Sequence, residues 1–172
     1  MSEGLAIEYP ATGALSVRVA DLHCDADAKV LLTLLDAYAA DPMGGGAPLD
    51  PAARERLPAA LAAFPGAFSL LAYLEDMPVG LANCFTGFST FAARPLVNIH
   101  DLVVLCAHRG KGIGRALMQA VEAEAAARGA CKVTLEVLSG NETAKALYAV
   151  QGYRSYALDP EAGTAQFWEK KL

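Results

Sequence analysis

Apolar residues alternate with polar ones in some stretches of the chain and recur at helical spacing in others. Residues 15–20, LSVRVA, alternate and predict a first strand. In residues 26–41 the apolar side chains fall three or four positions apart, which places them on one face of a helix. The pattern therefore opens with a strand followed by a helix.

Residues 42–50, PMGGGAPLD, combine glycine with proline and predict a flexible loop. The pair that closes this loop, Asp50-Pro51, is typical of an N-cap residue followed by the first helical position. We expect a second helix over residues 51–64, although Pro58 inside it would remove one backbone hydrogen bond.

Two strands, residues 67–75 and 78–89, follow with a connection short enough for a hairpin. Residues 95–106, PLVNIHDLVVLC, predict a further strand that is apolar on both faces toward its end, as in the centre of a sheet. A glycine-rich turn comes next. The apolar spacing after it predicts a helix to about Arg128, capped by Gly129.

The last part of the chain predicts a strand over residues 131–138 and a helix that begins after Asn141 and ends at Gly152. Two closing strands are predicted near residues 153–158 and 164–171. This order predicts one α/β domain over residues 1–172, with a single mixed sheet of about seven strands and helices on both faces.

Composition narrows the classes of function. Apolar residues make up 54% of the chain and charged residues 19%, as in a globular protein that buries a core. The net charge of −5 disfavours a nucleic-acid surface and is compatible with a cationic substrate. No apolar run reaches the roughly 18 residues of a membrane span, and the N-terminus lacks a signal-peptide pattern. We therefore expect a cytoplasmic protein that binds neither nucleic acid nor membrane.

Cysteine and histidine do not indicate a metal site. Four isolated cysteines, without a C-x-x-C pair, fit a reducing compartment and disfavour zinc. The three histidines show no metal-ligand spacing either. We therefore expect no metal cofactor.

The most informative stretch is LVVLCAHRGKGIGRAL, residues 102–117, where an apolar strand leads into a glycine-rich, cationic turn and then a helix. The glycines are Gly110, Gly112 and Gly114, and the cations are Arg109, Lys111 and Arg115. Glycine lets the backbone approach a ligand closely, and a helix N-terminus attracts anions through its free N–H groups and its dipole. The turn therefore predicts a site for a phosphate or pyrophosphate.

The spacing of this turn matches neither common nucleotide loop. A Walker A loop would need Gly-Lys-Ser/Thr, and the third glycine of a dinucleotide fingerprint would fall at Arg115. The pattern R-G-x-G-I-G-[KR]-x-L directly after a strand instead resembles the acyl-CoA pyrophosphate loop of the GNAT superfamily of N-acetyltransferases. A second stretch, NETAKALYAVQGY at residues 141–153, resembles another pattern of that superfamily, one strand further along.

The resemblance covers residues 97 to 153 and implies the GNAT fold, acetyl-CoA as cosubstrate and a homodimer. It implies that acetyl-CoA is bound by Val103, Val104, Leu105, Arg109, Gly110, Lys111, Gly112, Ile113, Gly114, Arg115, Asn141, Ala144 and Tyr148. The stretches YLEDMPVGLANCFTGFSTF and IHDLVV resemble the diamine branch, the spermidine/spermine and thialysine acetyltransferases. That branch has an acidic pair where this chain has His100-Asp101, which leaves the exact amine open.

Acetyl transfer to an amine needs a proton acceptor, because a free alkylamine has a pKa of about 10.4 and is mostly protonated near neutral pH. The candidates for this acceptor, directly or through a water chain, are Asp101 and His100 at the end of the cofactor strand, with Glu136 on the neighbouring strand. Asp101 is the one expected to be catalytic, and all three would also bind the cationic substrate. By the resemblance, backbone groups from Val103 to Leu105 hold the acetyl oxygen, where they would stabilise the developing oxyanion. The resemblance assigns protonation of the departing thiolate to Tyr148, and we expect that help to be modest.

Structural roles remain open for the same side chains. Tyr148 can be a core aromatic, Asp101 a cap or strand-edge carboxylate, His100 an ordinary hydrogen-bonding residue and Glu136 a solvent-facing one. The glycines at 44–46 follow no strand, so a mobile loop on the substrate side is expected rather than a second phosphate site.

These patterns together predict an N-acetyltransferase that transfers an acetyl group directly from acetyl-CoA to a primary amine. The expected acceptor is a small polyamine-like or amino-acid-derived molecule. Three alternatives remain: acetylation of a protein N-terminus or lysine, an acyl-CoA-binding sensor without turnover, and a nucleotide-binding module, which the broken dinucleotide spacing disfavours.

Overall fold

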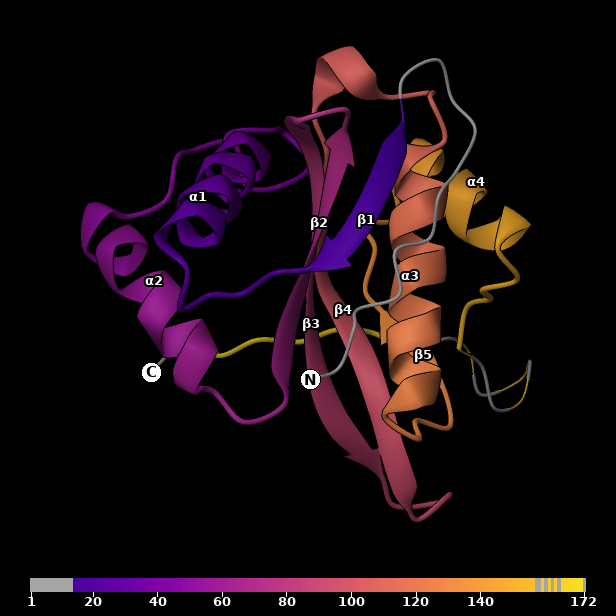
Figure 1. Cartoon of the computed structure of the whole chain (residues 1–172). Coiled ribbons are helices and arrows are strands. Elements are labelled where there is room, and N and C mark those ends of the chain that lie inside the picture. Colours follow the sequence, from indigo (N-terminus) through magenta and orange to yellow (C-terminus); the bar gives the residue numbers. More distant parts are fainter. Residues whose placement is uncertain (1–13, 157–158, 160, 162, 164, 172) are drawn as a thin grey trace. The chain divides into compact units, whose positions relative to one another are not determined.

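The structure is a computed structural model that describes residues 14–156, 159, 161, 163 and 165–171 (Figure 1). It contains two compact units, one ending at Leu135 and one beginning at Glu136, and each is described by itself. The strands are β1 (Leu15–Val19), β2 (Ala67–Leu74), β3 (Met77–Ser89), β4 (Arg94–Val104) and β5 (Val133–Leu135). The helices are α1 (Asp25–Ala39), α2 (Pro51–Ala63), α3 (Ile113–Ala127) and α4 (Glu142–Val150), with a short 3-10 helix at Cys106–His108.

The first unit is built on one mixed sheet in the order β1-β2-β3-β4-β5. The pairs from β1 to β4 are antiparallel, and β4 pairs with β5 in parallel. The mixed α/β architecture is therefore confirmed. The expected number of about seven strands is wrong, because the sheet has five.

The two predicted closing strands account for that difference. The strand expected over residues 131–138 is present but shorter, as β5. The two closing strands fall partly outside the described residues, at 157–158 and 164, and the described remainder of both forms no strand. A backbone hydrogen bond from Ala165 N to Tyr156 O, at 3.4 Å, joins the described parts of these two segments. Alternating side chains favour a strand, but a strand also needs a ladder of backbone partners.

Helices cover both faces of the sheet in the first unit, as Figure 1 shows with α1 and α2 on one side and α3 on the other. One buried cluster joins α3 to the sheet, with Leu117 and Val121 fully buried at its centre. The other cluster joins α1 to the opposite face, with Leu31 packed among Leu71 and Leu81. Each such side chain contributes about 1.5–3 kcal/mol through burial, so the sheet is held from both sides.

Gly80 in β3 permits the close packing of α3. A Cβ at this position would lie 3.0 Å from Leu117 Cδ1 and from Val103 O, and 3.2 Å from Ile113 Cγ2. Any larger residue would push the first turns of α3 away from the sheet. The start of α3, which follows the glycine-rich turn, is therefore positioned by a glycine on a neighbouring strand.

The helix boundaries follow the predicted capping. Asp50 Oδ1 accepts a hydrogen bond from Ala53 N at 3.0 Å, and Asn141 Oδ1 accepts one from Ala144 N at 3.2 Å. Pro58 lies inside α2 without ending it, and no residue of α2 is fully buried. None of the helices in the described part of the chain is long and apolar enough to cross a membrane.

Candidate active site

A β-bulge in β4 sets the direction of the side chains that were predicted to bind the amine. Opposite β3, Asn83 pairs with Asp101 and Cys84 pairs with Ile99, so His100 is the extra residue. Ile99 packs in the α3 cluster, whereas Val103, four positions later, packs in the α1 cluster. The bulge therefore reverses the alternation and places His100 and Asp101 on the face covered by α1 and α2.

Asp101 is held by a chain of buried hydrogen bonds that crosses three strands. Ser69 Oγ donates to Asn83 Oδ1 at 2.7 Å, and Asn83 Nδ2 donates to Asp101 Oδ2 at 3.0 Å. Ser69 and Asn83 are each 2% exposed, while Asp101 remains half-buried. The chain fixes the amide of Asn83 with its N–H groups toward the carboxylate, so Asp101 acts as an acceptor and keeps its other oxygen for a further partner.

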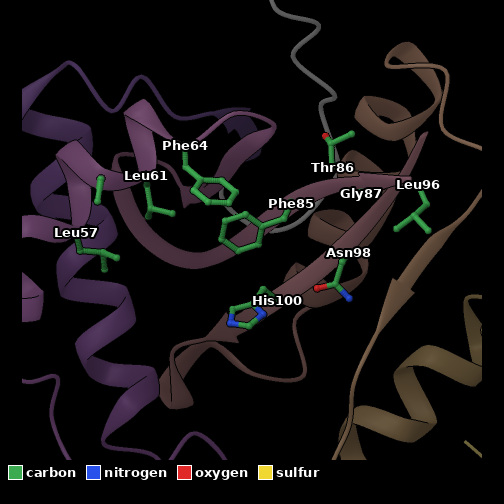
Figure 2. A pocket seen from close by; sticks show the side chains of 10 residues that line it. Leu57, Leu61, Phe64, Phe85, Thr86, Gly87, Leu96, Asn98 and His100 are labelled. Atoms are coloured by element: carbon green, nitrogen blue, oxygen red, sulfur yellow. The ribbon is translucent and has the colours of Figure 1, made fainter. Parts of the chain in front are cut away.

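A pocket of about 590 Å³ lies beside His100, between α2 and the strands β3 and β4 (Figure 2). The aromatic residues along one wall are Phe64, which follows α2, and Phe85 of β3, whose ring centroids are 5.6 Å apart in an edge-to-face arrangement. Figure 2 shows Phe85 between Phe64 and His100, and the Phe85 and His100 rings lie 5.5 Å apart. The pocket and the bulge thus open on the same face of the sheet.

The glycine-rich turn has the geometry of an anion site. Gly110 and Gly112 adopt positive φ angles of 77° and 83°, which favour glycine. A Cβ added at either position would meet nothing within 4 Å among the described residues. Gly112 is also the N-cap of α3, and no side chain hydrogen-bonds there as a cap. The first N–H groups of this 15-residue helix therefore have no side-chain cap, which is the condition for an anion to bind there.

The three cations of this turn differ in their partners. Arg109 donates from Nη2 to Asp41 Oδ2 at 2.8 Å and from Nε to Val104 O at 3.1 Å. Its hydrogen bond to Asp41 raises the pKa of Arg109. Lys111 and Arg115 are exposed and have no hydrogen-bond or ion-pair partner in the described part of the chain. Arg109 therefore braces the turn, while Lys111 and Arg115 are left for a ligand.

The strand before the turn has an unpaired edge. The ladder between β4 and β5 ends at Ile99 and Leu135, whereas β4 continues to Val104. On its other side this last part of β4 pairs with β3. Leu105 N donates to Val79 O of β3, so by strand alternation Val103 also faces β3 and Val104 faces the β5 side. The N–H group of Val104 therefore lacks a strand partner among the described residues, while its carbonyl oxygen accepts a hydrogen bond from Arg109 Nε.

Two residues near this region were missed by sequence analysis. Asn83 interrupts an otherwise apolar strand, and that break in the pattern was the only signal for it. Tyr38 at the end of α1 packs against the α1 cluster, and burial raises the pKa of its hydroxyl, with further contributions from the carboxylates of Asp101 and Asp41. The hydroxyl of Tyr38 therefore stays protonated near neutral pH.

The remaining predicted site residues belong to the second unit. Asn141 caps α4, Ala144 provides the capped N–H group, and Gly152 follows the helix with a φ of 88°. Tyr148 lies on α4 with its ring centroid 6.3 Å from that of Tyr153. The structure thus brings His100 and Asp101 together in the first unit, and the roles of Glu136 and Tyr148 stay predictions. In the described part of the chain, no group of three or more His, Cys, Asp or Glu side chains could hold a metal ion.

Comparison with known proteins identifies the family. The acetyltransferase (GNAT) family matches residues 32–153, most of the chain. The chain belongs to the GNAT family. The predicted superfamily is therefore confirmed, whereas its diamine branch stays a prediction. A comparison with curated protein sequences found no match.

Solved structures show the same GNAT fold. A putative acetyltransferase from Agrobacterium tumefaciens str. C58 is 27% identical with a TM-score of 0.70, over 91% of this chain and 99% of that one. An aminoglycoside acetyltransferase from an uncultured soil metagenomic sample, in complex with trehalose, is 18% identical with a TM-score of 0.72, covering 92% and 97%. A ribosomal-protein-alanine N-acetyltransferase from Brucella melitensis biovar Abortus 2308 is 21% identical with a TM-score of 0.62, covering 92% and 98%.

Proposed function

We propose that this GNAT acetyltransferase transfers an acetyl group from acetyl-CoA directly to a primary amine of a small polyamine-like or amino-acid-derived molecule. One observation carries the proposal. A helix N-terminus without a side-chain cap follows a strand with an unpaired edge, and that strand carries Asp101 toward the face with the pocket. The proposed phosphate site and the proposed amine site would thus belong to one continuous segment of the chain.

The glycine-rich turn would hold the pyrophosphate of acetyl-CoA, which supplies an activated acetyl group. The N–H groups at the start of α3 and the side chains of Lys111 and Arg115 are the donors available for it. The backbone N–H group of Val104, on the unpaired edge, would be suited to stabilise an oxyanion, because the ladder with β3 preorganises it.

Asp101 would attract the protonated amine and accept its proton. Its Oδ2 is already occupied by Asn83, so the second oxygen is the one that faces a substrate. Asn83 also restricts the carboxylate to one orientation, since its own amide is fixed by Ser69. In this arrangement Asn83 positions Asp101 without contacting the substrate. Protonation of the departing thiolate is the role we propose for Tyr148, on the resemblance alone.

The acidic composition supports a small cationic acceptor over a nucleic acid, since the net charge is −5. We further propose that the protein is cytoplasmic and a homodimer, and that it uses no metal. The homodimer rests on the resemblance to the superfamily. Sedimentation of the purified protein would test it directly.

The first experiment compares thermal stabilisation by acetyl-CoA, CoA, NAD and ATP, followed by a thiol-release assay with free amines and with peptides. We expect acetyl-CoA and CoA to raise the melting temperature and one class of small amine to release thiol. Stabilisation without turnover would favour the acyl-CoA sensor, and faster turnover on peptides would favour a protein acetyltransferase. Stronger stabilisation by NAD or ATP would exclude the assignment of the turn.

A second experiment tests Asp101. We expect Asp101→Asn to lower kcat by about 100-fold, within the range typical for loss of a general base, while acetyl-CoA still stabilises the protein. Asp76→Asn, in the hairpin turn between β2 and β3, is the matched control and should leave kcat unchanged. Equal turnover by both variants would remove Asp101 from the mechanism.

A further inference from the structure

We propose that the pocket between α2 and β3–β4 binds the body of the acceptor, and that this body is apolar, an aryl or branched alkyl group, rather than a polycation. The proposal rests on the proposed acetyl transfer and narrows its acceptor. Of the two acceptor classes proposed above, it excludes polyamine-like molecules and favours an amine with one positive charge and one apolar end.

The walls of the pocket are apolar and aromatic. Leu57 and Leu61 of α2 face Phe85 of β3 and Leu96 of β4, and Phe64 stands at the end of α2 (Figure 2). Phe64 keeps 57% of its surface exposed despite its contact with Phe85. A flat ring entering the pocket would cover this apolar surface and could contact Phe64 and Phe85 by edge or face.

Among the described residues, none that lines the pocket carries a carboxylate. Its polar side chains are Thr86, Asn98 and His100, and none of these carries a negative charge. A polyamine bound there would leave water with several ammonium groups and meet no counter-charge, which costs far more than apolar contacts return. A molecule with a single amine avoids that cost, provided that the amine stays outside the apolar part.

The bulge supplies the place for the amine. His100 lines the pocket, and the next residue, Asp101, faces the same side of the sheet with one carboxylate oxygen left by Asn83. An amine at Asp101 would therefore sit at the boundary of the pocket while its apolar body extends past His100 toward Phe85. The volume of about 590 Å³ lies within the usual range for small-molecule sites.

The test uses three probes with acetyl-CoA: 2-phenylethylamine, ethylamine and spermidine. Ethylamine carries the same amine without the ring, and spermidine carries several charges. Burial of one phenyl ring is expected to raise kcat/KM for 2-phenylethylamine at least ten-fold above that for ethylamine, and we expect a similar margin over spermidine. A value for spermidine that equals or exceeds that for 2-phenylethylamine would overturn the inference and leave acetyl transfer standing.

Two exposed phenylalanines provide matched variants. Phe64 lines the pocket, whereas Phe88, 63% exposed on β3, does not. We expect Phe64→Ala to raise KM for 2-phenylethylamine about ten-fold with ethylamine unchanged, and Phe88→Ala to change neither. Equal effects of the two substitutions on the aryl amine would contradict the proposed site.

Binding is measured separately, by titrating 2-phenylethylamine into the CoA-loaded protein in a calorimeter. Saturable binding that weakens about ten-fold in Phe64→Ala, and not in Phe88→Ala, supports the proposed pocket. If such binding is seen but no amine releases thiol, the proposed acetyl transfer is contradicted and the binding site is still supported. Absence of saturable binding to the wild-type protein overturns the inference whatever the turnover assay shows.

Discussion

Gly44, in the loop after α1, and Gly110 and Gly112, in the turn before α3, are glycines for opposite physical reasons. At Gly44 an added Cβ would lie 2.0 Å from the carbonyl oxygen of Tyr38, so the loop packs directly on the end of α1. At Gly110 and Gly112 an added Cβ would meet nothing within 4 Å in the described part of the chain, and the backbone instead requires a positive φ. Gly44 thus contacts the protein closely, whereas Gly110 and Gly112 leave space beside them. Gly46, with a φ of 74° and nothing within 4 Å of an added Cβ among the described residues, shares the second behaviour.

That difference distinguishes a glycine that packs against the protein from one that leaves space in which a ligand could bind. The loop at Gly44 is closed on itself, because the carbonyl of Asp41 accepts hydrogen bonds from the N–H groups of Gly44, Gly45 and Gly46 at 2.8–3.1 Å. The N–H groups at the start of α3 have no side-chain cap. The number of glycines in a segment does not show whether they pack within the protein or leave space for a ligand. The hydrogen-bond partners of the backbone N–H groups distinguish these two roles.

Asp41 links the two segments. Its carboxylate accepts a hydrogen bond from Met43 N at 2.9 Å and another from Arg109 Nη2 at 2.8 Å. The loop beyond α1 and the cationic turn before α3 are therefore braced against each other. The loop at residues 42–50 was expected to be mobile, and the hydrogen bonds show that its first half is held by Asp41.

The largest effect is expected for Gly112→Val. The new side chain would fill the space in front of α3, so we expect acetyl-CoA to bind at least about 100-fold more weakly, measured as the loss of thermal stabilisation. Gly129→Val is the matched control, since Gly129 has a φ of 73° and open space but lies at the other end of α3. Both variants should lose about 1–3 kcal/mol of stability through backbone strain. Loss of acetyl-CoA binding in both would mean that strain, and not the occupied space, is responsible.

A smaller effect is expected for Gly44→Ala. The added methyl group would meet the Tyr38 carbonyl, and the loop would have to shift, at a cost of about 1–3 kcal/mol in the free energy of unfolding. Gly140→Ala is the control, because its Cβ would meet nothing within 4 Å and no positive φ is required. Urea denaturation should show the difference. Equal stability of the two variants would show that the loop does not pack tightly on α1.

The smallest effect is expected for Asp41→Asn. The N–H group of Met43 and then the Arg109 guanidinium hold the pKa of Asp41 below its usual range, so its stabilising contribution is present above about 3.9, the unfolded value, and is lost as pH falls through the lower folded value. Arg109 is about half exposed, so we expect a loss of at most about 1 kcal/mol at pH 7. Urea midpoints of the variant and the wild type should converge as the pH falls through the lowered pKa of Asp41 in the folded protein. A difference that persists there would assign the effect to packing.

Most of the predicted elements depend on residues that are close together in the sequence. The helix boundaries that depend on capping were confirmed. Asp50-Pro51 begins α2, Asn141 caps α4 and Gly129 follows α3, because a cap depends on residues within one turn of the helix. The predictions for strands near the two ends of the chain had different outcomes. The first predicted strand is β1, which pairs with β2, whereas the described parts of the two closing segments form no strand.

The candidate site divides in the same way. His100, Asp101 and the glycine-rich turn could be predicted, since their residue types and order in the chain indicate chemistry directly. The β-bulge could not be predicted from the sequence. A one-residue insertion in a ladder depends on the register with β3 and does not change the apolar pattern of β4. Asn83 and Ser69, which orient Asp101, and Asp41, which braces Arg109, are likewise distant in sequence from the residues they hold.

By itself, the sequence determined the order of the helices, the position of the glycine-rich turn and the family, because these depend on short-range spacing and capping. Only the tertiary structure decided which face Asp101 occupies, which glycines contact the protein and which leave space, and that an apolar pocket lies beside His100. These properties arise when strands pair in one register and α2 packs beside them. Such pairing is set by contacts between residues far apart along the chain, and no local pattern encodes it.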